Sequence, residues 1–103
     1  MKRGEVRWYK FKSPDKKRPV VIVTRNSILE YLSEVTVAPV TSTIRDIPSE
    51  VLLSKQDGMH NDCAINCDPI QTVSKAKIGS LITTLPKEKL FELHSAICFA
   101  LNL

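Results

Sequence analysis

An almost continuous run of β-branched residues at positions 19–24 (PVVIVT) constrains this 103-residue chain more than any other segment. A run of this kind, without alternating polar residues, is typical of a strand that is buried on both faces. A second strand-like segment, residues 34–40 (EVTVAPV), follows it along the chain. The two segments therefore predict two strands of one rigid sheet.

Polar groups flank these two predicted strands. Residues 16–18 (Lys-Lys-Arg) come directly before the first strand, and residues 41–43 (Thr-Ser-Thr) come directly after the second. This order can place the guanidinium of Arg18 beside hydroxyl groups at the end of the sheet. Because the planar fork of an arginine matches phosphate oxygens in pairs, such a site suits a phosphodiester.

Shorter signals predict the other elements. Alternating side chains predict a first strand at residues 4–11, and a short helix at residues 26–32 would begin at an Asn or Ser cap. Pro39 lacks an N–H donor, which predicts an edge strand or a bulge at that position. The remaining predicted elements are strands at residues 50–53, 63–67, 70–73 and 80–83 and a helix at residues 86–101.

The last predicted helix is amphipathic. Its apolar face would consist of Leu90, Leu93, Ile97 and Leu101, widened by Phe91 and Cys98, with His94 on the same side. The predicted fold class is therefore mainly β (α+β), a strongly bent antiparallel sheet closed by a C-terminal helix. At this length we expect one domain over residues 1–103.

The positive charge of the chain is concentrated near its start. The formal net charge is +4, but residues 1–18 alone carry +6 and the remainder carries −2. A clustered cationic patch on a small domain favours a polyanionic partner such as a nucleic acid. The same cluster of charge would also fit a solvated surface or a surface that binds an acidic protein.

Hydropathy and cysteine content indicate a cytoplasmic protein. The longest apolar runs are far shorter than the roughly 20 residues that a membrane span needs, and the basic N-terminus lacks the apolar core of a signal peptide. Three cysteines do not suit a secreted disulfide framework. Cys63 and Cys67 on one strand would lie about 13 Å apart, too far for a disulfide. A zinc site with His60 or His94 is conceivable, but we expect ordinary buried thiols.

Four motifs follow one another along the chain. They are residues 3–8 (RGEVRW), 18–23 (RPVVIV), 37–42 (VAPVTS) and 62–73 (DCAINCDPIQTV). In this order and spacing they resemble the motifs of the MazF/PemK/Kid family of toxin endoribonucleases. Each motif alone is modest, but four in this order and spacing make a strong match, which runs over nearly the whole length of the chain.

The resemblance implies a bent, SH3-like antiparallel barrel that works as a homodimer. It implies sequence-specific cleavage of single-stranded RNA without a metal or other cofactor, which leaves 2′,3′-cyclic phosphate and 5′-hydroxyl ends. The RNA would be mRNA, with rRNA and tRNA as alternatives. It further implies a cognate MazE-like antitoxin with an acidic tail, and contact with operator DNA only through the antitoxin complex.

The family's catalytic arginine falls on Arg18 and its catalytic threonine on Thr41. Arg18 would neutralise charge on the transition state, Thr41 would donate a hydrogen bond to the phosphate, and the 2′-hydroxyl of the RNA would be the nucleophile. Base stacking by Trp8 and Tyr9 is an alternative to a place in the core. The residues that we predict to contact RNA are Lys16, Lys17, Ser42, Thr43, Arg45, Asn66, Asp68 and Gln71.

Some positions depart from the family pattern and leave alternatives open. Gln71 stands where many members have Arg or His, and the segment at residues 12–17 is shorter than in many relatives. Asn66 and Asp68 could be turn residues instead of ligands for RNA. At the level of function, the competing hypotheses are a DNA gyrase poison of the same fold and a non-catalytic SH3-like nucleic-acid-binding module.

Overall fold

A computed structural model describes residues 1–11 and 17–103 of the chain. Lys16, which we predict to contact RNA, lies outside the described residues. The helices and strands are β1 (Glu5–Lys10), β2 (Lys17–Ile22), α1 (Asn26–Leu29), β3 (Glu34–Thr41), β4 (Glu50–Leu53), η1 (Lys55–Asp57), β5 (Cys63–Asn66), β6 (Gln71–Ser74), η2 (Lys75–Lys77), β7 (Ile78–Thr84) and α2 (Lys87–Leu101).

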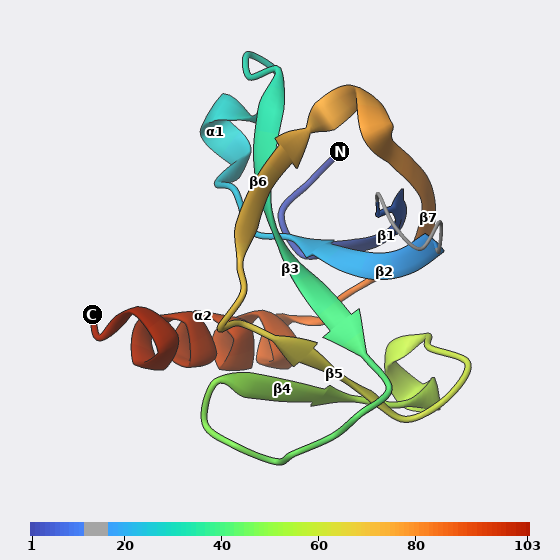
Figure 1. Ribbon diagram of the computed structural model, residues 1–103, viewed down its shortest axis with the longest axis vertical. Coiled ribbons are helices and arrows are strands. Elements are labelled where there is room, and N and C mark those ends of the chain that lie inside the picture. The colour runs from blue at the N-terminus through green and yellow to red at the C-terminus, as the bar shows by residue number, and fades with distance from the viewer. Residues whose placement is uncertain (12–16) are drawn as a thin grey trace.

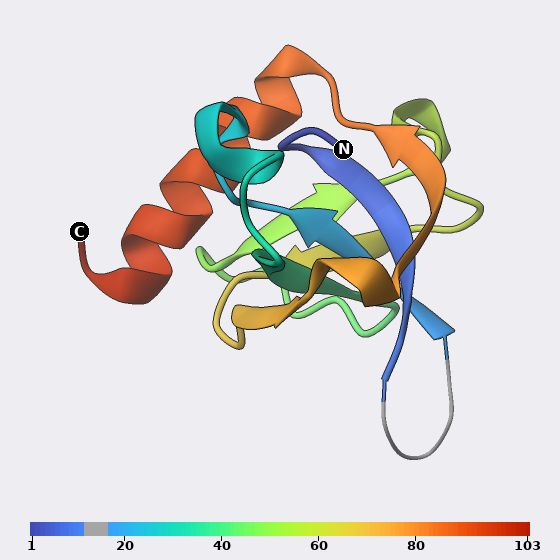
Figure 2. The same cartoon turned by 90° about the horizontal axis from the view of Figure 1, so that it is seen from above.

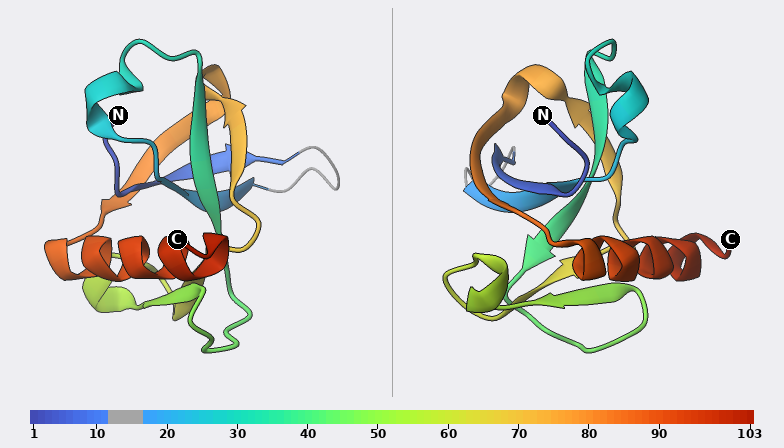
Figure 3. Two further views of the ribbon diagram at one scale, coloured as in Figure 1. Left: turned by 90° about the vertical axis from the view of Figure 1, so that its left-hand side faces the viewer. Right: turned by 180° about the vertical axis from the view of Figure 1, so that it is seen from behind.

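The strands form a bent antiparallel sheet in the order β4-β5-β3-β2-β1-β7, and β6 also pairs with β3 (Figure 1). The long strand β3 makes the bend possible because one of its edges pairs with β6 near its start and with β5 near its end. Helix α2 lies along one side of the sheet beside β4 (Figures 2 and 3). The predicted class, a bent antiparallel sheet with a C-terminal helix, is confirmed.

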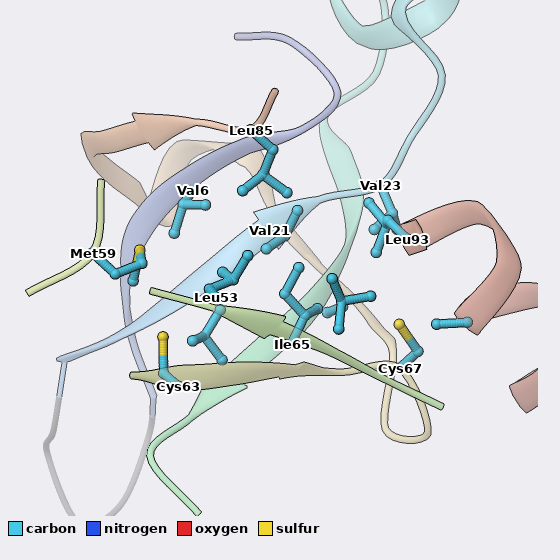
Figure 4. Close-up of a cluster of buried hydrophobic side chains, with 14 residues drawn as sticks. Val6, Val21, Val23, Leu53, Met59, Cys63, Ile65, Cys67, Leu85 and Leu93 are labelled. Atoms are coloured by element: carbon cyan, nitrogen blue, oxygen red, sulfur yellow. The ribbon is translucent and has the colours of Figure 1, made fainter. Parts of the chain in front are cut away.

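Strand β2 contributes side chains to two hydrophobic clusters of the described residues. Val21 contributes to a cluster that also contains Val6, Ile65 and Leu93 and lies between the sheet and α2 (Figure 4). Val20 and its neighbours pack instead into a second cluster on the other face of the strand, with Val35, Val37, Val73 and Leu29. The prediction that this strand is buried on both faces is confirmed.

The expectation for Pro39 is wrong. Strand β3 is interior, and its pairing with β2 runs without a register shift through the pair Val20–Pro39. On the opposite edge, the pairing of β3 with β6 ends at Val37 and the pairing with β5 begins at Val40. Pro39 therefore lies in the gap between two partners, where a missing N–H donor costs no ladder hydrogen bond.

The helices also differ from expectation in detail. The residue that caps α1 is Arg25, without a side-chain hydrogen bond, because Asn26 instead accepts a hydrogen bond from the backbone N–H of Arg3. In α2, Leu93 and Ala96 are buried, whereas Phe91 is 73% exposed and Leu101 is 48% exposed. The buried face of α2 is thus narrower than the apolar pattern predicts.

Among the described residues, neither α1 nor α2 has the length and hydropathy that a membrane-spanning helix needs.

Candidate active site

Arg18 and Thr41 line the same cavity, which has a volume of about 260 Å³. Arg18 lies at the start of β2 and Thr41 at the end of β3. These strands are antiparallel, and the last pair of their ladder on this side is Val20–Pro39. Arg18 comes two residues before Val20 and Thr41 two residues after Pro39, so both lie beyond the same end of this ladder. The sheet topology therefore brings the two predicted catalytic residues together.

The cavity has an apolar wall and a polar rim. Its apolar side chains come from several strands, and Trp8 of β1, which is 36% exposed, is the largest of them. Ser42 joins Arg18 and Thr41 on the polar side. The other lining residues are Pro19, Val40, Met59, His60, Asn61, Asp62, Cys63 and Ile82.

The polar groups at this rim are available to a ligand. In the described part of the chain, the exposed Arg18 guanidinium and the Ser42 hydroxyl make no hydrogen bond or ion pair. The Oγ1 atom of Thr41 accepts a hydrogen bond from the backbone N–H of Thr43 at 3.1 Å. Because that contact uses only an acceptor site, Thr41 keeps its hydroxyl proton for donation.

Sequence reasoning missed the polar segment His60-Asn61-Asp62 as part of this site. The segment connects η1 to β5 and lies between Met59 and Cys63, which are both buried. The signal that could have found it is a polar triplet with an apolar residue on each side, directly after the Asp57-Gly58 turn. Such a pattern indicates a short surface connection that is anchored at both ends.

Local hydrogen bonds fix the start of this segment. Ser54 and Asp57 form a capping box around η1, and Gly58 then takes a left-handed conformation with φ of 95°. Thr83 donates a hydrogen bond from Oγ1 to the carbonyl oxygen of Asp57 at 2.9 Å. A Cβ atom at Gly58 would lie 2.3 Å from that same Oγ1, so the turn needs glycine for its backbone and for its space.

Arg45, Asn66 and Asp68 do not line the cavity. Arg45 pairs through Nε with Oε2 of the buried Glu50 at 3.1 Å. The other carboxylate oxygen of Glu50 accepts hydrogen bonds from the backbone N–H groups of Arg45 and Asp46, at 2.9 and 3.1 Å. These contacts hold Asp46 in its left-handed conformation, with φ of 54°. Arg45 therefore has a structural role in the β3–β4 connection.

The contacts of Asn66 and Asp68 are those of turn residues. Asn66 Oδ1 accepts a hydrogen bond from the backbone N–H of Asp68 at 3.1 Å, and Asp68 Oδ2 accepts one from Ser49 Oγ at 2.8 Å. Asn66 is the last residue of β5, and Asp68 follows two residues later. The alternative that the sequence left open, a capped connection, fits these contacts.

The remaining residues predicted to contact RNA do not line the cavity. Lys17 lines a neighbouring cavity of about 100 Å³ together with Tyr9, Lys10 and Lys77. Trp8 borders both cavities and so separates the lysines from Arg18. Thr43 and Gln71 are exposed, and Gln71 pairs with Val37 in the β3–β6 ladder.

The two buried cysteines are poorly reactive, and one of them, Cys63, lines the cavity. Cys63 and Cys67 are free and buried. Burial, with smaller contributions from Asp62 and Asp57, raises the pKa of the Cys63 thiol. Burial and then Asp68 raise the pKa of Cys67 to about 11. Since the reactive form of cysteine is the thiolate, neither thiol suits a nucleophilic role near neutral pH.

Arg18, Thr41 and Ser42 thus bring a guanidinium and hydroxyl groups to the rim of one cavity, and these are groups that bind anions. The description "PemK-like, MazF-like toxin of type II toxin-antitoxin system" matches residues 2–101. The chain belongs to this family. The family assignment made from the sequence, to toxin endoribonucleases of this kind, is confirmed.

Relatives of known name agree with this assignment. Endoribonuclease MazF3 of Mycobacterium tuberculosis is 38% identical over 68 residues, which are 66% of this chain and 66% of that protein, just under two thirds of either. Probable endoribonuclease MazF5 of the same species is 35% identical over 101 residues, which cover 97% of this chain and 88% of the relative.

Solved structures show the same fold. The Mycobacterium tuberculosis toxin MazF-mt6 superimposes with a TM-score of 0.87 at 32% sequence identity, covering 96% of this chain and 97% of that one. A mycobacterial endoribonuclease solved in complex with its cognate antitoxin gives a TM-score of 0.88 at 24% identity, covering 100% and 96%. The second match supports the fold alone.

Proposed function

We propose that this chain is a sequence-specific, metal-independent endoribonuclease toxin that cleaves single-stranded RNA. The substrate is mRNA, with rRNA and tRNA as alternatives, and the products carry 2′,3′-cyclic phosphate and 5′-hydroxyl ends. The observation that carries this proposal is the shared cavity of Arg18 and Thr41, because it offers a free guanidinium and a hydroxyl to one phosphate.

The proposed reaction needs no nucleophile from the protein. The ribose 2′-hydroxyl attacks the adjacent phosphorus, so the substrate supplies the nucleophile. Negative charge gathers on the phosphate oxygens in the transition state, where Arg18 neutralises it and Thr41 donates a hydrogen bond. The Ser42 hydroxyl lies next to Thr41 on the same rim and gives the phosphate a further donor.

The proposed partners follow from the family and the surface. The family description places such toxins in type II toxin–antitoxin systems, which supports a cognate MazE-like antitoxin. Contact with operator DNA only through the antitoxin complex is part of the same proposal. Exposed aromatic side chains on α2, with Phe91 at 73% and Phe99 at 61%, support a homodimer. We place this activity in the cytoplasm, where RNA is available.

One experiment tests the proposed function. The purified protein is incubated with a long single-stranded RNA in EDTA, and both new ends are mapped and their terminal groups identified. Discrete cuts that leave cyclic phosphate and 5′-hydroxyl ends are expected, and the Arg18→Ala variant should lose them. Intact RNA together with inhibited gyrase supercoiling would contradict the proposal, as would salt-dependent RNA binding without any cleavage.

A further inference from the structure

The connection between η1 and β5 brings a histidine to the cavity of Arg18 and Thr41. His60 lines this cavity together with Asn61 and Asp62 of the same segment. In the described part of the chain, the His60 ring makes no hydrogen bond or ion pair, so both of its nitrogens are available. The other histidine, His94, lies on α2 and borders a different cavity.

The fold fixes where His60 lies. The preceding residue, Met59, is buried, and its backbone N–H donates a hydrogen bond to the carbonyl oxygen of Ser54 at 3.2 Å. Cys63, at the other end of the segment, is buried and pairs with Leu53 in the β4–β5 ladder. His60 is therefore presented to the cavity from a short connection held by the core on both sides.

The proposed reaction needs a group that takes a proton. A 2′-hydroxyl attacks phosphorus effectively only as its proton is removed. Arg18 is always protonated, and Thr41 and Ser42 carry neutral hydroxyls that do not act as bases. Of the charged and titratable side chains that face His60 in the cavity, Arg18 comes from β2, Asp62 from the same segment and Cys63 from β5. The candidates for a proton acceptor are thus His60 and Asp62.

Basicity favours the histidine. A carboxylate with an ordinary pKa of about 4 is a weak base, whereas an imidazole with an ordinary pKa of about 6.5 matches a reaction near neutral pH.

We propose, resting on the proposed function above, that His60 is the catalytic proton acceptor of the RNA cleavage. A free ring nitrogen of His60 takes the proton of the 2′-hydroxyl as the O2′–P bond forms. The P–O5′ bond breaks with its electron pair on O5′, which takes a proton from water. The imidazolium returns its proton to the hydroxide so formed, and no other reactant is consumed.

The test compares His60→Ala with the matched control His94→Ala. Single-turnover cleavage of a short single-stranded RNA with one mapped cut is measured from pH 5 to 9. We expect His60→Ala to slow cleavage by about 10²–10⁴-fold at neutral pH and to lose the rise in rate with pH that the wild type shows in the range of imidazole titration. Added imidazole should restore part of the rate, and His94→Ala should behave as the wild type.

Thermal unfolding and RNA affinity of each variant separate catalysis from folding and binding. A His60→Ala protein that is folded, binds RNA as the wild type does and keeps the wild-type rate and pH profile overturns the inference. A loss of rate without a change in the pH profile and without rescue by imidazole also overturns it. The inference is also overturned if Asp62→Asn abolishes the rise in rate with pH while His60→Ala keeps it.

These outcomes are distinct from failure of the proposed function. If the wild type leaves every RNA uncut, the proposed function fails. If the wild type cleaves and Arg18→Ala does not, while His60→Ala cleaves normally, only the role of His60 is contradicted.

Discussion

Arg18 and Thr41 lie on neighbouring antiparallel strands, at the start of β2 and the end of β3, and they line one cavity. The ladder between these strands ends two residues from each of them, at Val20–Pro39, so neither side chain depends on a long loop for its place. Sites built on strands hold their geometry more closely than sites built on loops. The mutational predictions for the site follow from this relationship.

Replacing Arg18 should abolish most cleavage without unfolding the protein. Arg18→Ala removes one preorganised donor to the transition state, which costs about 10²–10³ in rate. Arg18→Lys should also lose most activity, because a point charge does not reproduce the bidentate fork. Single-turnover cleavage measures the loss, and unchanged thermal unfolding shows that the fold is intact. Wild-type rates in Arg18→Ala would remove this residue from the site.

At position 41 the hydroxyl should matter more than the shape of the side chain. Thr41→Val keeps the branched shape but removes the donor, and we expect cleavage to fall by at least tenfold. Thr41→Ser keeps the hydroxyl and should retain most of the rate. Because Thr41 Oγ1 also accepts a hydrogen bond from Thr43, both variants need a check of stability by thermal unfolding. Equal rates for Thr41→Val and Thr41→Ser would contradict a role for the hydroxyl.

The lysines beyond Trp8 should contribute to RNA binding through phosphate contacts. Lys17 and Lys77 border the same small cavity, from β2 and η2. Neutralising a lysine that contacts one phosphate of a single strand should lower the slope of log K against log salt by about 0.7. Titrations with Lys17→Ala and Lys77→Ala at several salt concentrations measure this, and Lys87→Ala on α2 is the control. An unchanged slope would remove these lysines from the RNA surface.

Glu50 should matter more for stability than Arg45. The Glu50 side chain is fully buried and accepts three hydrogen bonds in the β3–β4 connection, whereas the Arg45 side chain is 48% exposed. Glu50→Ala leaves these donors without their acceptor and should cost about 2–4 kcal/mol in the free energy of unfolding. Arg45→Ala removes one of the three donors but leaves the carboxylate its two backbone N–H partners, so it should cost less, about 1–2 kcal/mol. Urea unfolding of both variants tests the difference, and equal costs would contradict it.

Alkaline pH should weaken the fold through Cys67. Burial and then Asp68 raise the pKa of this thiol to about 11 in the folded protein, above the ordinary value of 9.0. The folded state therefore keeps a proton that the unfolded state loses. The resulting stability is fully present below pH 9 and is lost as the pH rises toward 11, with a slope of up to about 1.4 kcal/mol per pH unit. Stability curves for wild type and Cys67→Ala should converge over this range, and parallel curves would contradict the prediction.

Much of the fold could be predicted from local patterns. The predicted strand at residues 50–53 matches β4, and the other predicted strands overlap the observed ones with shifts at their ends. The interior position of Pro39 could not be predicted, because the sequence does not reveal that one edge of β3 changes its partner strand beside this residue. The apolar pattern of α2 likewise overestimates its buried face, since it includes Phe91, which is 73% exposed.

The candidate site could be predicted where it lies on strand ends, and not where it lies on connections. Arg18 and Thr41 occupy positions that strand pairing fixes. Arg45 is predicted to contact RNA, but in the structure it pairs with Glu50 of the next strand. No local sequence pattern links these two residues. His60 reaches the cavity only because the turn at Gly58 redirects the chain after η1. Such placements depend on tertiary contacts.

The proposed function requires that the 2′-hydroxyl of the RNA attacks its own backbone at the Arg18–Thr41 cavity. The most direct measurement uses an RNA oligonucleotide with one mapped cut and a second one that carries a single 2′-deoxynucleotide on the 5′ side of that bond. We expect the wild-type protein to cut the all-ribose RNA in EDTA and to leave the same bond intact in the RNA with the 2′-deoxynucleotide. Cleavage of both oligonucleotides at the same bond and rate would contradict it.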